Sequence, residues 1–248
     1  MPRRLGQHFL ASTSTLKRIA SAALPGEPEP VIEIGPGRGP LTEYLSPRAA
    51  SLHAIEVDQV LVHYLQEKFR GTPAFTVHHD DVLRADLNQW APAVVAGNLP
   101  YYITSPIVDK VLRLGPLLRR AVFLVQREVA ERMAAAPGSR DYGYLSVSCQ
   151  VLARTRYLFT VPPGAFRPPP KVDSAVVLLE PHAKPLMQDV DDFLAFASAC
   201  FTQKRKTLRN KLSGAYDRQK VEAQPEAKLR AEQLPIEQLV DLYRRLKP

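Results

Sequence analysis

The stretch Val31-Ile32-Glu33-Ile34-Gly35-Pro36-Gly37-Arg38-Gly39 leads from an apolar run, through closely spaced glycines, to a helical pattern that begins near Leu41. Glycine lets a ligand lie directly against the backbone, and the first turn of the next helix offers free N–H groups to an anion or a polar nucleoside tail. A strand, a glycine turn and a helix in this order are typical of a nucleotide-binding α/β sheet. The stretch therefore predicts a fold class and a ligand site together.

Further apolar runs continue this pattern along the first half of the chain, and helical patterns lie between them. The runs are Leu52–Val57, Ala74–His78, Ala93–Ala96 and Val122–Val125. Such alternation predicts βαβ units and a mostly parallel, Rossmann-like α/β sheet with helices on both faces. Ligands of these sheets bind at the carboxyl ends of the strands, so we expect the chemistry there.

The second half of the chain changes character. We expect a helix at 144–153 and strands at 156–160 and 175–180, separated by a loop whose three consecutive prolines forbid a helix. After Pro185, helical spacing recurs at 191–200, 203–212 and 236–246. These patterns predict a catalytic domain over residues 1–184 and a small helical domain over residues 185–248.

Composition narrows the class of protein. The 248 residues are 45% hydrophobic and 23% charged, which is ordinary for a soluble protein, and no stretch approaches the roughly 18 apolar residues of a membrane span. The amino terminus lacks the apolar run of a signal peptide. Cys149 and Cys200 are too few for a disulfide framework and form no C-x-x-C pair. We expect a cytoplasmic protein without a metal site or a membrane partner.

Positive charge points to a polyanionic partner. The net charge is +8, and basic side chains crowd one short segment near the end of the chain. A solvated helix face would produce the same run of basic side chains. The functional interpretation is that this run binds nucleic acid. The candidate RNA-binding residues are Lys204, Arg205, Lys206 and Arg209, with Lys211 close by.

Acidic residues at two strand ends fit a nucleoside cofactor. Glu56 closes the second strand, where a carboxylate can accept hydrogen bonds from both ribose hydroxyls. Asp81, followed by Val82, comes after the third strand and can accept from an adenine amine. The glycine spacing is G-x-G-x-G, with Pro40 next, instead of the dinucleotide pattern G-x-G-x-x-G. This favours S-adenosylmethionine, and a nicotinamide cofactor remains the alternative.

The fourth strand ends in Gly97-Asn98-Leu99-Pro100-Tyr101, beside the predicted cofactor. Adenine N6 is a poor nucleophile because its lone pair is delocalised into the ring, so acceptors that draw its protons out of the ring plane assist reaction. The Asn98 side-chain oxygen is one acceptor, and the Leu99 carbonyl is another, since a residue before proline is extended. Pro100 contributes no competing donor.

Aromatic residues complete the predicted substrate site. Tyr101 offers a face on which an extruded base can stack, and Phe166, in the proline-rich loop, is the candidate for the opposite face. Ordinary packing is the alternative for both rings. No general base is assigned, because methyl transfer from a sulfonium is a direct displacement in which positioning and hydrogen bonding suffice.

These motifs resemble the KsgA-type 16S rRNA adenine N6,N6-dimethyltransferases over most of the chain. The shared segments are LGQHFL (5–10), EIGPGRGPLT (33–42), NLPYYIT (98–104), VFLVQREVAERM (122–133), GSRDYGYLSV (138–147), FRPPPKVDSAVV (166–177) and FTQKRKTLRNKL (201–212).

The resemblance implies a monomeric class I methyltransferase that adds two methyl groups to each of two adjacent adenosines near the 3′ end of 16S rRNA during small-subunit assembly. The resemblance and the positions of residues at the strand ends together predict these cofactor-binding residues: His8, Leu10, Gly35, Gly37, Glu56, Asp81, Val82 and Asn98. One departure is that the family usually has Asn where this chain has His8.

Three alternatives remain open at this point. A related methyltransferase modifies one adenosine of 23S rRNA and confers macrolide resistance, with the same chemistry. A nicotinamide oxidoreductase would use a similar sheet but would give Asn98 no role. An RNA-binding assembly factor would depend on contacts with RNA, with methyl transfer incidental.

Overall fold

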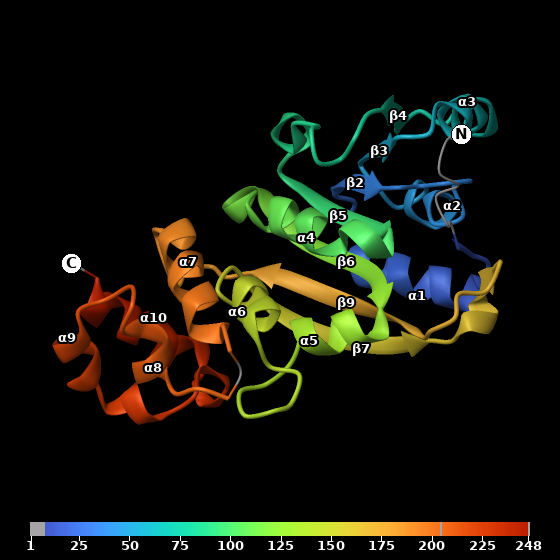
Figure 1. The fold of residues 1–248 in the computed structure, drawn as a ribbon. Helices are drawn as coiled ribbons and strands as arrows, with labels where there is room; N and C mark the ends of the chain where they lie inside the picture. Colours follow the sequence, from blue (N-terminus) through green and yellow to red (C-terminus); the bar gives the residue numbers. More distant parts are fainter. Residues whose placement is uncertain (1–7, 204, 248) are drawn as a thin grey trace. The chain divides into compact units, whose positions relative to one another are not determined.

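The computed structural model describes residues 8–203 and 205–247 (Figure 1), and its chain divides into two compact units. The first unit comprises residues up to 130 and Thr155–Pro181, and the second comprises Glu131–Arg154 and residues from His182 onward. This division differs from the expected boundary at 184/185, because Tyr142, Val147 and Val151 pack into the core of the second unit. The chain therefore enters the helical unit twice.

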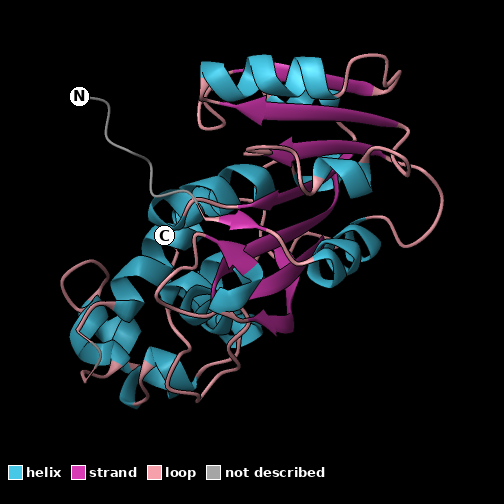
Figure 2. Cartoon of the chain, turned by 90° about the vertical axis from the view of Figure 1, so that its right-hand side faces the viewer, coloured by secondary structure: helices cyan, strands magenta, loops and turns pink. Residues whose placement is uncertain are grey.

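A seven-stranded sheet contains all the strands that the sequence predicts, in the spatial order β4-β3-β2-β5-β6-β9-β7. The first five strands of this order are parallel to one another, and β9 runs antiparallel to β6. Figure 2 shows how the strands twist across the sheet. The strands are β2 (Pro30–Ile34), β3 (Ser51–Glu56), β4 (Phe75–His79), β5 (Ala93–Asn98), β6 (Leu118–Gln126), β7 (Ala153–Val161) and β9 (Ser174–Pro181).

Helices cover the sheet because alternate residues of the central strands face opposite sides. Val94 and Ala96 of β5 belong to one buried cluster with Leu16 and Ile19 of α1 (Thr13–Ala23) and with Leu45. On the other side of the sheet lies α4 (Thr104–Leu112), whose buried residues include Ile107 and Val111 (Figure 1). The remaining helices that follow strands here are α2 (Thr42–Leu45), α3 (Gln59–Lys68) and α5 (Arg127–Met133).

A short strand near the start of the described chain is held by the proline-rich region. Strand β1 (Phe9–Leu10) pairs antiparallel with β8 (Phe166–Arg167), and Leu10 lies opposite Phe166. The Ala11 N–H also donates to the Ala165 carbonyl at 2.7 Å. This pairing fixes His8 and Ala11, the described residues on either side of β1, at the carboxyl edge of the sheet.

The second unit is helical, as expected, but two helices differ in length from the prediction. The 144–153 helix ends at Gln150, because β7 begins at Ala153. The 203–212 helix begins only after Thr207, which is extended, and Gln203 has a left-handed φ of 51°. The helices are α6 (Tyr144–Gln150), α7 (Val190–Phe201), α8 (Leu208–Leu212), α9 (Arg218–Glu222) and α10 (Ile236–Leu246). Across residues 8–203 and 205–247, no helix is both long and apolar enough to cross a membrane.

Candidate active site

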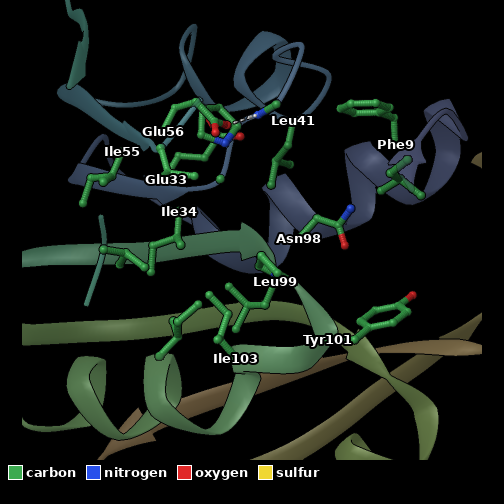
Figure 3. Close-up of a pocket in the computed structure, with 18 of the residues that line it drawn as sticks. Phe9, Glu33, Ile34, Leu41, Ile55, Glu56, Asn98, Leu99, Tyr101 and Ile103 are labelled. Atoms are coloured by element: carbon green, nitrogen blue, oxygen red, sulfur yellow. Dashed lines mark hydrogen bonds between the residues drawn. The ribbon is translucent and has the colours of Figure 1, made fainter. Parts of the chain in front are cut away.

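A cavity of about 520 Å³ opens at the carboxyl ends of β2, β3 and β5 (Figure 3). The chain leads from β2 to β3 on one side and from the neighbouring β5 to β6 on the other side, so the cavity lies where ligands of open α/β sheets bind. The structure brings every predicted cofactor-binding residue to its wall: His8, Leu10, Gly35, Gly37, Glu56, Asp81, Val82 and Asn98.

The glycine turn and Glu56 form one hydrogen-bonded unit. Gly35 and Gly37 both have positive φ, which favours glycine. The Gly37 N–H donates to Glu56 Oε2 at 3.1 Å, and the Asp58 N–H donates to Oε1 at 3.0 Å. Burial raises the pKa of Glu56, while these bonds act against the rise. A carboxylate has about four acceptor positions, so Glu56 can accept further bonds from a ligand.

A second acidic element is the turn after β4. The Asp81 carboxylate accepts the Leu83 N–H at 2.9 Å, and the Asp81 N–H donates to Asp80 at 2.7 Å. These bonds form a turn that holds Asp81 at the cavity wall, with the largely buried Val82 beside it. The arrangement is suited to a polar group at one end and an apolar ring at the other.

Glu33 also lines the cavity, although the sequence does not predict it as a site residue. Its side chain is only 1% exposed, and Thr42 Oγ1 donates to its Oε2 at 2.7 Å. The pKa of Glu33 is raised to about 7, mainly by burial; the Thr42 bond acts against the rise, and the nearby Glu56 adds to it. Its position inside an apolar strand, just before the glycine turn, was the available signal, because a buried acid with a perturbed pKa marks a candidate functional site.

The raised pKa of Glu33 makes stability depend on pH. Between about 4.5 and 7 the unfolded chain loses the Glu33 proton while the folded chain keeps it, so the free energy of unfolding falls as pH rises through this window. We expect Glu33→Gln to remove this pH dependence, which is a fall of at most about 1.4 kcal/mol per pH unit in the free energy of unfolding. Urea unfolding from pH 4.5 to 8 measures it. An identical pH profile for both proteins would contradict the assignment.

Asn98 is oriented by the amino-terminal segment. Its Nδ2 donates to the His8 carbonyl at 3.0 Å, which leaves Oδ1 as the free acceptor end of the amide. Figure 3 shows this oxygen on the side of Tyr101 and the nitrogen on the side of Phe9. The Leu99 N–H donates to the Leu124 carbonyl at 3.0 Å and continues the β5–β6 pairing, while its buried side chain anchors the turn. Pro100 then begins the turn with φ of −60°.

Tyr101 is held at both ends. Its hydroxyl shares a 2.7 Å hydrogen bond with Ser174 Oγ at the start of β9, and the His8 ring lies nearly parallel to it with centroids 6.3 Å apart. Burial raises the pKa of Tyr101, so the phenol is neutral at physiological pH. His8 itself donates from Nδ1 to the Pro168 carbonyl at 2.9 Å. His8 thus contacts Asn98 and Tyr101, two of the residues that the sequence assigns to the target adenine.

The structure does not bring Phe166 to this cavity. Its side chain is 0% exposed and packs in the buried cluster with Leu10, its partner across the β1–β8 pair. The expectation that Phe166 faces the target base is corrected accordingly. Pairing of β8 with β1 turns this ring inward, and neither proline content nor sequence position could reveal that pairing.

The basic segment divides into surface and buried residues. Arg205, Lys206 and Arg209 are exposed, whereas Lys204 lies outside the described residues. The Lys211 side chain is 1% exposed and donates to the Cys200 carbonyl at 2.7 Å, with Glu232 at 3.8 Å. Burial lowers the pKa of Lys211. Lys211 therefore supports the core of the second unit and does not belong to its basic surface.

The fold and the cavity together define a class I methyltransferase. The predicted α/β class is confirmed, and solved structures share the architecture over nearly the whole chain. The 23S rRNA methyltransferase ErmE has a TM-score of 0.77 and 32% identity, covering 97% of this chain and 100% of its own. A dimethyladenosine transferase from Plasmodium falciparum has a TM-score of 0.83 and 25% identity, covering 95% and 96%.

Sequence comparison gives the family. The model of the family described as ribosomal RNA adenine dimethylase matches residues 2–247, and the chain belongs to this family. Two similar relatives are both named ribosomal RNA small subunit methyltransferase A. That of Acidobacterium capsulatum is 45% identical, covering 98% of this chain and 90% of the relative. That of Pseudomonas putida is 42% identical, covering 97% and 92%. The oxidoreductase alternative does not agree with this membership.

Proposed function

We propose that the protein transfers methyl groups from S-adenosylmethionine to N6 of two adjacent adenosines near the 3′ end of 16S rRNA, during assembly of the small ribosomal subunit in the cytoplasm. The observation that carries the proposal is that Asn98 and Tyr101 line the same cavity as the predicted cofactor residues. The names of the 45% and 42% identical relatives support the choice of small-subunit RNA.

The cavity residues fit this cofactor. Glu56 has free acceptor positions for ribose hydroxyls, Asp81 can accept from the adenine amine, and Leu10 and Val82 supply apolar surface. Gly37 has no room for a side chain, because a Cβ there would lie 2.9 Å from the Phe9 ring. When bound, S-adenosylmethionine supplies a methyl group activated by its sulfonium.

The chain's own residues then position the target. Asn98 Oδ1 and the Leu99 carbonyl accept hydrogen bonds from the adenine amine, which directs the nitrogen lone pair out of the ring plane. The Tyr101 ring supports the extruded base and is itself fixed through Ser174. Proton loss follows after transfer, so the residues act by orientation and by excluding water.

Mapping the products tests the proposal. Purified protein should methylate unmethylated small subunits at two adjacent adenosines near the 3′ end of 16S rRNA, detected by primer extension and mass spectrometry. The alternative keeps support from ErmE, a 23S rRNA methyltransferase with 32% identity. Modification of a single 23S rRNA adenosine, with none in 16S rRNA, would overturn the proposal in favour of that alternative.

The exposed basic residues of the second unit should bind phosphates. We expect Arg205→Ala, Lys206→Ala and Arg209→Ala together to weaken RNA binding and to reduce the slope of log affinity against log salt by about 2. Fluorescence anisotropy with labelled RNA between 50 and 200 mM salt, roughly the range in which phosphate contacts are lost, measures this. Lys220→Ala with Lys228→Ala is the matched control, since both are exposed in the same unit. A slope unchanged in the triple variant would make the segment a solvated face.

A further inference from the structure

Tyr102 is an exposed aromatic residue at the rim of the cavity. It follows Tyr101 in the 3₁₀ turn Tyr101–Ile103, and both residues line the cavity. A 3₁₀ helix has three residues per turn, so successive side chains diverge by about 120°. The Tyr101 hydroxyl is bound to Ser174, whereas the Tyr102 side chain is 69% exposed. One tyrosine is therefore part of the wall, and the next stands in solvent at its edge.

The backbone that carries Tyr102 is fixed on both sides. The Ile103 N–H donates to the Pro100 carbonyl at 3.2 Å, and Thr104 Oγ1 donates to the same carbonyl at 3.1 Å. Thr104 is itself buried. Single exposed hydrophobic residues are ordinary on protein surfaces. Tyr102 differs because a rigid turn presents it beside a cavity whose other wall residues include Asn98.

At this edge of the sheet, the start of α4 next to Tyr102 favours an anion. Helix α4 begins just after Tyr102, with no acidic residue in its first turn and no side-chain cap from Ile103. Ser174 pairs with Gln126 and bonds Tyr101, so the segment before β9 lies at this edge. That segment carries Lys171, which is exposed and has no ion pair among the described residues. An aromatic ring near positive potential is the combination that binds single-stranded nucleic acid.

We propose that Tyr102 stacks the base of the nucleotide next to the target adenosine, while Lys171 and the first turn of α4 attract its phosphate. The inference rests on the proposed function and extends it to a second nucleotide. When one adenosine of an adjacent pair occupies the cavity, the other adenosine is the neighbour at the rim. Tyr102 thus stacks the adenine of the second adenosine. The protein then recognises the adjacent pair instead of a single adenosine.

The test is a double-mutant cycle between protein and RNA. The probe is a dye-labelled single-stranded RNA with the adjacent adenosine pair, compared with the same RNA made abasic at the neighbouring position. We expect Tyr102→Ala to bind the intact RNA about tenfold more weakly, as loss of one stacked base should. The abasic RNA should bind the natural protein about tenfold more weakly too, and Tyr102→Ala should add no further loss with it.

Two further variants make the result decisive. Tyr102→Phe should restore binding, because stacking needs the ring and not the hydroxyl. Tyr64→Ala removes an exposed tyrosine from α3, outside this cavity, and should bind like the natural protein. Losses that simply add, or a Tyr102→Phe variant as weak as Tyr102→Ala, would overturn the inference. Methylation of 16S rRNA by the natural protein is measured separately. Its failure would count against the proposed function and not against base stacking on Tyr102.

Discussion

Asn98→Ala should lower kcat for methyl transfer by about 10²- to 10³-fold, the cost of removing one oriented hydrogen-bonding group from a reacting centre. The variant loses the acceptor for the target amine and also the 3.0 Å bond to the His8 carbonyl. RNA affinity should change little, because the basic surface and Tyr102 are untouched. Single-turnover methylation of small subunits measures the rate, and calorimetry measures cofactor affinity.

A second substitution separates the two roles of Asn98. Asn98→Asp keeps an acceptor oxygen but cannot donate to His8, so it should retain more activity than Asn98→Ala. Asn88→Ala, at an exposed asparagine whose side chain bonds only Asp86 among the described residues, is the matched control. A natural kcat in Asn98→Ala would exclude the proposed mechanism. Complete loss of methylation with entirely normal subunit maturation would instead favour the RNA-binding assembly role.

Gly97→Ala should destabilise the first unit and disable the site together. A Cβ at Gly97 would lie 2.5 Å from the Ile34 carbonyl oxygen and 3.3 Å from the side chains of Ile34 and Leu99. Backbone atoms cannot move aside as a side chain can, so β2 and β5 must separate where their carboxyl ends form the cavity. We expect a loss of about 3 kcal/mol in the free energy of unfolding.

The comparison for Gly97→Ala is Gly164→Ala. Gly164 has no positive φ, and apart from its chain neighbours no heavy atom of the described residues lies within 4 Å of an added Cβ. Urea unfolding of both variants gives the free energies, and calorimetry tests whether Gly97→Ala still binds S-adenosylmethionine. Equal stability and equal cofactor affinity in the two variants would show that the β2–β5 contact tolerates the extra carbon.

The sequence predicts well where local pattern and chemistry agree. The strands follow from apolar runs, and the cavity follows from the rule that parallel strands place their carboxyl ends at one edge. Glu56, Asp81 and Asn98 follow because each stands at the end of a strand or in the turn just after it. These inferences need only the order of elements, not the details of packing.

Other features depend on long-range packing and stay hidden in the sequence. Phe166 was misassigned because only its pairing with Leu10 turns the ring inward. In the sequence Lys211 cannot be distinguished from its exposed basic neighbours. Only the structure shows that its side chain is buried and donates to the Cys200 carbonyl. The 131–154 segment joins the second unit through tertiary contacts made far along the chain. Tyr101 and Tyr102 are identical in the sequence, which cannot reveal that Tyr101 bonds Ser174 while Tyr102 is exposed.

His8 also has a consequence for how the protein becomes active. It bonds Pro168 across 160 positions of sequence and Asn98 across 90, while Tyr101 reaches Ser174 across 73. Contacts between residues far apart in sequence close large loops, which slows their formation during folding. The geometry at Asn98 and Tyr101 is therefore complete only after the chain as far as β9 has folded. Methyl transfer would report finished folding of the whole first unit, and a partly folded chain would carry the motifs without the activity.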